Sequence, residues 1–181
     1  MTAPTPDPTR REATVSWHDP ADVLPRLVAL DGLAYVRAVR DGELPPDPLM
    51  ETLGISVLEA EPGRVVMVAD PAGQHLNLGG IVHGGFLAIL MDCASGFALH
   101  TTVPAGSTTP HVAVAYAFLR SGREGVALRC TGEVLRAGSR LGHVRAEVHD
   151  ADGRLLATGE TTHAIVDTTK GGGGLRSGPS A

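Results

Sequence analysis

Apolar positions near the start of the chain recur at the three- and four-residue spacing of a helix. The pattern predicts one helix over residues 20–41, with an apolar side formed by Val23, Leu24, Leu27, Val28, Leu30, Leu33, Val36 and Val39. Asp41-Gly42 and the following Pro45-Pro46 end it. Two runs with strand character come next, at 55–59 and 64–69, joined by the turn Glu61-Pro62-Gly63.

A second helix is predicted from Gly84 to about Thr101, with apolar residues on nearly all of its sides. That distribution indicates a helix surrounded by other structure. Beyond it, the pattern predicts strands at 112–118, 126–135, 141–150 and 154–166, the last three joined by short turns as in an antiparallel meander. The economical packing is an α+β fold, in which a strongly curved antiparallel sheet wraps around one long central helix, with an extra N-terminal helix.

The length of 181 residues fits one domain, which we place at residues 17–167. Residues 1–16, rich in Pro, Thr and charge, are expected to form a disordered tail. Residues 168–181, rich in Gly and Ser, are expected to form a flexible one. The formal charge of −5 offers no clustered basic surface for nucleic acid, which is therefore not expected as a partner.

The longest apolar stretch, residues 84–99, is interrupted by Asp92 and is shorter than the roughly 20 residues of a membrane span. The N-terminus also lacks an apolar signal segment. We therefore expect a cytoplasmic protein without membrane insertion. The only cysteines, Cys93 and Cys130, have no ligand-like spacing and are interpreted as buried free thiols in a reducing compartment.

Candidate chemistry gathers at the start of the second predicted helix. Gly79, Gly80, Gly84 and Gly85 surround His83 there, which allows a ligand to approach the main chain closely. The first turn of a helix has unpaired N–H groups and the positive end of the helix dipole. Such a site suits a carbonyl oxygen that gains negative charge during acyl transfer, although glycine-rich loops before helices are common without any function.

Asp92 is the only charged residue between Gly84 and Leu99. An ionised carboxylate on an apolar helix costs several kcal/mol unless it is paired or faces a cavity, so a functional role is favoured over a capping one. Asp92 lies eight residues after Gly84, about 12 Å along the axis. One helix therefore cannot present both groups to one carbonyl. Two chains related by a two-fold axis can, which predicts a homodimer or homotetramer with shared sites.

The run Asn77-x-x-Gly80-x-x-His83-Gly84-Gly85, with Asp92 nine residues after the histidine, resembles the signature of PaaI-like hotdog-fold acyl-CoA thioesterases. The segments Phe118–Gly122, Gly138–Arg140 and Asp152–Leu155 also fit the course of that family, although Ser121 replaces its usual proline. The resemblance covers about residues 48–166.

The resemblance implies hydrolysis of an acyl-CoA, with the Gly84 N–H polarising the thioester carbonyl and Asp92 of the partner chain acting as nucleophile or general base. It further implies that His83 and Gly85 orient the substrate, that Asn77 positions the lytic water, and that no metal or redox cofactor takes part. A polar residue on the following strand assists the Asp in this family. Two alignments leave both Thr109 and His111 as candidates, with Thr109 slightly preferred.

The remaining charged groups carry weaker signals. Arg120, Arg136 and Arg140 sit at predicted strand ends, where they could bind the phosphates of coenzyme A or simply be solvated. His75 could border the site, and the scattered His100, His143, His149 and His163 show no metal-ligand spacing.

Two other functions remain open at this stage, a hotdog enoyl-CoA hydratase or dehydratase and a non-catalytic acyl-CoA-binding module. The His83-Gly84-Gly85 run with Asp92 favours the thioesterase over the first, and the cost of Asp92 argues against the second. The acyl group and the choice between coenzyme A and a carrier protein stay undetermined.

Overall fold

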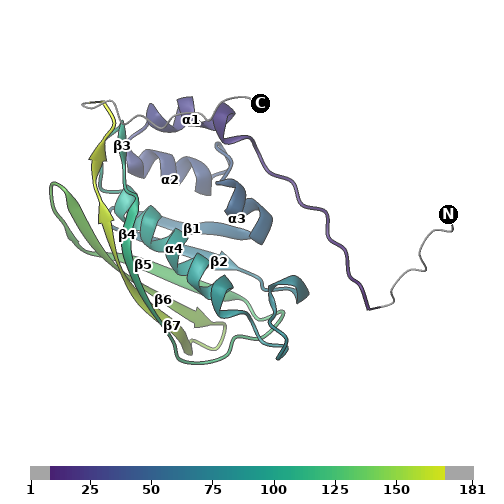
Figure 1. Ribbon diagram of the computed structural model, residues 1–181. Coiled ribbons are helices and arrows are strands. Elements are labelled where there is room, and N and C mark those ends of the chain that lie inside the picture. Colours follow the sequence, from purple (N-terminus) through teal and green to yellow (C-terminus); the bar gives the residue numbers. More distant parts are fainter. Residues whose placement is uncertain (1–8, 170–181) are drawn as a thin grey trace, which may run out of the picture.

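The computed structural model describes residues 9–169 and shows a curved six-stranded antiparallel sheet with one long helix, α4 (Gly84–His100), lying across its concave face (Figure 1). The sheet order is β1-β2-β5-β6-β7-β4. Its strands are β1 (Ile55–Glu61), β2 (Arg64–Ala69), β4 (His111–Phe118), β5 (Leu128–Ala137), β6 (Leu141–Asp150) and β7 (Leu155–Ala164). The predicted α+β hotdog architecture is confirmed, including the β5-β6-β7 meander.

Strand β4 precedes the meander in the chain but pairs with its last strand, β7, at the edge of the sheet. The apolar and polar pattern of β4 does not contain this information, because strand neighbours are decided by long-range packing. A small second sheet, β3 (Ser107–Thr108) with β8 (Val166–Asp167), was not predicted. The expected 154–166 strand ends as β7 at Ala164, and Val166 belongs to β8 instead.

The predicted helix over 20–41 is present as two helices, α1 (Pro20–Val28) and α2 (Gly32–Arg40). The break occurs because Asp31 caps α2 by accepting a hydrogen bond from the Ala34 N–H at 2.8 Å. Gly32 then lies against the end of α4, where an added Cβ would be 1.6 Å from the His100 carbonyl oxygen. A third helix, α3 (Pro48–Leu53), begins at the capping residue Asp47.

The side chains that α4 buries are almost all apolar, namely Phe86, Leu87, Leu90, Met91, Cys93, Ala94, Ser95, Ala98 and Leu99. The helix backbone approaches β5 so closely at Gly132 that an added Cβ would lie 2.3 Å from the Ala94 carbonyl oxygen. Cys93 and Cys130 lie in this core as free thiols, as predicted. Burial raises the pKa of the Cys93 thiol to about 12, so it remains protonated and unreactive.

Most of the two predicted tails lies outside the described residues, namely 1–8 and 170–181. Residues 10–16 are exposed and form neither helix nor strand. At the other end, the Thr168 N–H and hydroxyl both donate hydrogen bonds to the Gly106 carbonyl. In the described part of the chain, no helix is long and apolar enough to cross a membrane.

Candidate active site

The start of α4 leaves one backbone N–H available at the position that the sequence singled out. The ring Nδ1 of His83, which caps the helix, accepts a hydrogen bond from the Gly85 N–H at 2.8 Å. The His83 N–H donates to the His75 carbonyl at 2.8 Å. Within the described residues the Gly84 N–H, between the two, has no acceptor. A helix N-terminus with a free N–H is suited to hold a developing oxyanion.

A hollow of about 240 Å³ opens beside this N–H, and we call it the helix-end hollow. Asn77, Gly84, Phe118 and Arg120 are among its lining residues. Asn77 is held in a turn, because its side-chain oxygen accepts a hydrogen bond from the Gly79 N–H at 2.8 Å. Arg120 donates to the Leu155 carbonyl at 2.8 Å. Three predicted site residues, Asn77, Gly84 and Arg120, therefore come together here.

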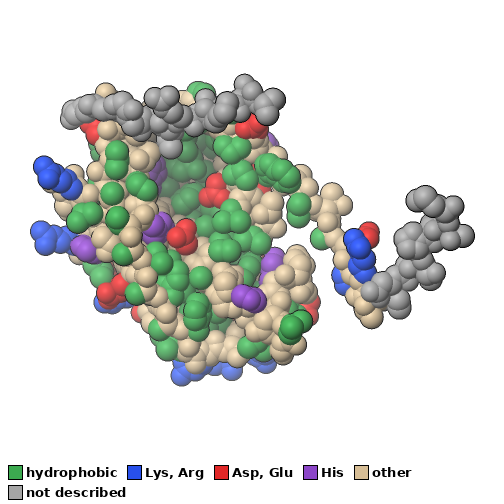
Figure 2. Space-filling model, in the orientation of Figure 1, with side chains coloured by type: hydrophobic (Ala, Val, Ile, Leu, Met, Phe, Trp, Pro, Cys, Tyr) green, Lys and Arg blue, Asp and Glu red, His purple; other side chains and the backbone are tan. Residues whose placement is uncertain are grey.

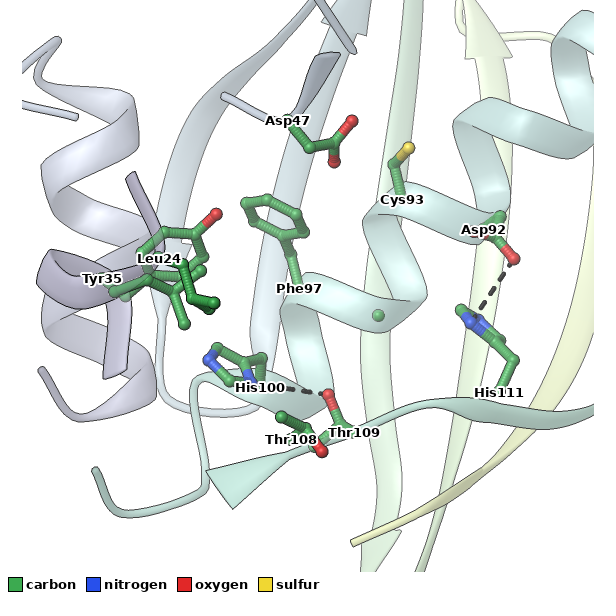
Figure 3. Close-up of a pocket in the computed structure, with 12 residues that line it drawn as sticks. Leu24, Tyr35, Asp47, Asp92, Cys93, Phe97, His100, Thr108, Thr109 and His111 are labelled. Carbon is green, nitrogen blue, oxygen red and sulfur yellow. Dashed lines mark hydrogen bonds and ion pairs between the residues drawn. The ribbon is translucent and has the colours of Figure 1, made fainter. Parts of the chain in front are cut away.

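Asp92 lies two turns further along α4 and faces a different hollow, of about 310 Å³, which we call the Asp92 chamber (Figure 3). Its Oδ1 lies 3.4 Å from Nδ1 of His111, the first residue of β4. The Asp92 side chain is 50% exposed in the single chain. The Asp92 carboxylate therefore loses less of its hydration than the apolar sequence of the helix suggested.

His111 is held on its other side by Ser95, one turn after Asp92 on the same helix. The Ser95 hydroxyl donates to the Asp92 carbonyl at 3.0 Å, so its oxygen accepts the hydrogen bond from Nε2 of His111 at 3.1 Å. In this arrangement the proton of a neutral His111 lies on Nε2, and Nδ1 can accept a hydrogen bond from Asp92 only when the Asp92 carboxyl is protonated. Burial lowers the pKa of His111, opposed by the nearby Asp92 charge, and the net lowering favours this neutral form.

His163 of β7 supports His111 from the sheet, with the two ring centroids 3.9 Å apart. His163 is fully buried, and its ring nitrogens contact the Thr109 carbonyl at 3.1 Å and the Thr161 hydroxyl at 2.8 Å. Burial, and then the neighbouring His111, lower the pKa of His163. Two imidazoles with lowered pKa values are thus in tilted contact, and one of them, His111, adjoins Asp92.

Other predicted residues are placed differently. The Thr109 hydroxyl lies 3.5 Å from Nδ1 of His100 and has no contact with Asp92 (Figure 3). Arg140 lies in the exposed β5–β6 turn and lines neither hollow. Gly85 is exposed beside His83, and the buried His75 stacks on Phe86 at 4.3 Å.

Sequence reasoning missed Ser95 and His163. The helical spacing of three residues places Ser95 beside Asp92 and could have indicated it. His163 is brought to His111 only by the pairing of β4 with β7, in which the two residues are direct partners. No local pattern carries that information.

The comparisons with known proteins show the family of this chain. The sequence pattern of the Thioesterase superfamily matches residues 79–157, which contain the start of α4 and Asp92. A putative esterase of Deinococcus radiodurans is 31% identical over 137 residues, which are 72% of this chain and 90% of that protein. Human acyl-coenzyme A thioesterase 13 is 29% identical over 109 residues, or 60% of this chain and 77% of that one.

Solved structures show the same fold. The TT0310 protein of Thermus thermophilus is 31% identical with a TM-score of 0.60, over 66% of this chain and 97% of that one. The PaaI protein of E. coli superposes with a TM-score of 0.67 at 23% identity, over 74% and 95% of the two chains. The family and the fold together show a thioester hydrolase of the hotdog type. The chain belongs to the Thioesterase superfamily, and within it resembles the PaaI-like members that the sequence motif indicated.

Proposed function

We propose that this protein hydrolyses acyl-CoA thioesters in a dimer, each active site being made from the helix-end hollow of one chain and Asp92 of the other. The proposal rests on one observation, the distance between the two halves of the site, the Gly84 N–H and the Asp92 carboxylate. Gly84 and Asp92 are about 12 Å apart along one helix axis and open into hollows that share no lining residue. A reacting carbonyl must lie within about 3 Å of both groups, directly or through one water.

The edge strand β4 supports a two-fold arrangement that joins the half-sites. Its first residue, His111, borders the Asp92 chamber, and its last, Phe118, borders the helix-end hollow. Antiparallel pairing of β4 with the same strand of a second chain would set the beginning of one beside the end of the other. The helix-end hollow of each chain would then meet the Asp92 chamber of its partner.

Exposure along β4 fits this pairing. Val112, Val114 and Phe118 of β4, and Leu119 directly after it, are each at least 50% exposed, and the outer edge of the strand has no partner within residues 9–169. Apolar side chains and free backbone groups on one edge mark a surface that another strand covers. Figure 2 shows hydrophobic side chains gathered along this part of the molecule, beside the hollow between the sheet edge and the N-terminal helices.

The proposed chemistry places the thioester oxygen on the Gly84 N–H, which stabilises the negative charge that develops on it. Asp92 acts at the carbonyl carbon as nucleophile, or on a water held near Asn77 as general base. In both cases the carbon–sulfur bond breaks, water supplies the new oxygen of the acid, and coenzyme A leaves as the thiol. Neutral His111 serves as a positioning residue, because its Nδ1 can accept a hydrogen bond from Asp92 once the carboxyl gains a proton.

Mixing two inactive variants tests both parts of the proposal. We expect Asp92→Asn and His83→Ala each to lower kcat for acyl-CoA hydrolysis by about 10²–10⁴-fold. Subunit exchange between them creates one intact site per heterodimer. Activity should therefore return to roughly a quarter of the wild-type value if chains reassort at random.

The matched control mixes Asp92→Asn with the double variant His83→Ala/Asp92→Asn, which can form no intact site. If the first mixture stays as inactive as this control although mass spectrometry shows heterodimers, the shared site is refuted. If the wild type releases no free thiol from any acyl-CoA, the substrate assignment is refuted.

A further inference from the structure

The Asp92 chamber extends well beyond the groups needed for hydrolysis. It runs from Asp92 and His111 along α4 to the N-terminal helices, and most of its wall is apolar (Figure 3). The helices α1 and α2 that border it lie outside residues 79–157, the segment that matches the superfamily. The far half of the chamber is therefore built partly by segments of this chain that the shared family pattern does not include.

Helix α1 forms one wall through Leu24 and Leu27, both half-buried. The side of the helix turned away from Leu24 is exposed, and the C-cap residue Ala29 lies there, about 140° around the axis from Leu24. No residue of α1 is fully buried. Leu27 also packs against the main core, whereas Leu24 is not among the residues that do and contributes to the chamber wall. The Arg26 side chain ties α1 to the loop after α2 by donating to the Glu43 carbonyl at 3.0 Å.

An aromatic cluster closes the other end. The Tyr35 ring of α2 meets the rings of Phe97 and His100, with centroid distances of 5.8 Å and 5.6 Å. Edge-on and tilted contacts of this kind hold large side chains in fixed positions. The chamber thus has a defined length from Asp92 to this cluster.

Charge restricts what can enter. Asp47 and Asp92 both line the chamber, and among the described residues no Lys or Arg does. The Asp47 carboxylate caps α3 by accepting a hydrogen bond from the Met50 N–H at 3.0 Å. A ligand with a terminal carboxylate would meet only negative charge there, whereas a neutral apolar group would find a matching wall.

From these observations we propose that the Asp92 chamber holds the acyl group of the thioester, and that Leu24 and Leu27 of α1 set the longest acyl chain accepted. The inference rests on the proposed thioesterase function and assigns its substrate class, neutral apolar acyl groups of medium length. The volume of about 310 Å³ is roughly twice that of a cavity that binds one benzene, which corresponds to roughly six to ten carbons.

A chain-length series of saturated acyl-CoAs, from acetyl to dodecanoyl, tests the assignment through kcat/KM for thiol release. In the wild type, kcat/KM should rise by roughly fourfold per added methylene until the chamber is full, and then level off or fall. Leu24→Trp should lower the ratio of octanoyl-CoA to acetyl-CoA activity by at least tenfold. Leu24→Ala should move the optimum to longer chains.

Ala29→Trp is the matched control, since the same large side chain is then added at the end of α1 on its exposed side. It should leave the chain-length profile at that of the wild type. If Leu24→Trp and Ala29→Trp give the same profile, the chamber does not hold the acyl group. A uniform loss across the series, acetyl-CoA included, also contradicts the assignment, because a wall residue acts only on chains that reach it. Absence of thiol release by the wild type would instead refute the thioesterase proposal itself.

Discussion

Gly132 of β5 couples the sheet to the helix that carries Asp92, and replacing it with alanine should damage both stability and activity. The new Cβ would lie 2.3 Å from the Ala94 carbonyl oxygen and 2.6 Å from its carbon. Both atoms belong to helix backbone, which cannot move aside as a flexible side chain can. Ordinary contact begins at 3.4 Å, so helix and strand must separate by about 1 Å.

The expected loss of unfolding free energy is about 1–3 kcal/mol, the usual cost of overpacking a core. Reduced freedom of the unfolded chain offsets about 0.4–1 kcal/mol of it, because alanine replaces glycine. Asp92 is two residues before Ala94 on the same helix. A displacement of about 1 Å at the reacting group can cost about 10²-fold in rate, so kcat should fall much more than the modest loss of stability alone explains.

The measurements are urea unfolding at fixed protein concentration and kcat for acyl-CoA hydrolysis at a temperature where the variant is fully folded. Gly73→Ala is the matched control, since the nearest atom to its added Cβ is a flexible Glu124 oxygen at 3.4 Å. It should change neither quantity appreciably. If Gly132→Ala equals the wild type in both, the close approach of α4 to β5 does not position Asp92.

Two further predictions concern the histidines near Asp92. His111→Gln should lower kcat by about 10–100-fold and alter the acid side of the pH–rate profile, whereas Thr109→Val should do neither; the reverse result would return the assisting role to Thr109. Burial lowers the pKa values of His75, His100, His111 and His163, so between pH 7 and 5.5 the unfolded chain binds more protons than the folded one. Stability is then fully present above the ordinary histidine pKa and falls on acidification, by at most about 1.4 kcal/mol per pH unit for each histidine. Urea unfolding of His163→Gln should show a shallower pH slope than the wild type, and an identical slope would show that His163 does not contribute.

The architecture was largely predictable because its elements have strong local patterns. Apolar residues on nearly all sides of α4 indicate a helix enclosed by other structure and not one on the surface. The meander of β5, β6 and β7 follows from alternating apolar and polar residues and from short turns. The predicted boundaries of helices and strands were wrong where tertiary contacts override the local apolar pattern. The helix predicted over 20–41 divides because Asp31 caps a new helix and Gly32 must touch the end of α4.

Local sequence also identified both halves of the candidate site, since a glycine-rich helix start and a single carboxylate on an apolar helix are unusual for physical reasons. It likewise indicated that the two halves cannot act within one chain, because helix rise alone separates them by about 12 Å. These conclusions depend only on residues near one another in the chain.

The partners of Asp92 required the tertiary structure. His111 and Thr109 are two residues apart in the chain, and no local sequence rule decides which of them contacts Asp92. The pairing of β4 with β7 and the packing of α4 across the sheet bring His111 and His163 to Asp92, while Thr109 is left beside His100. The Asp92 chamber likewise exists only where α1, α2 and α4 meet, because a cavity is formed by segments distant in sequence and is encoded by none of them alone.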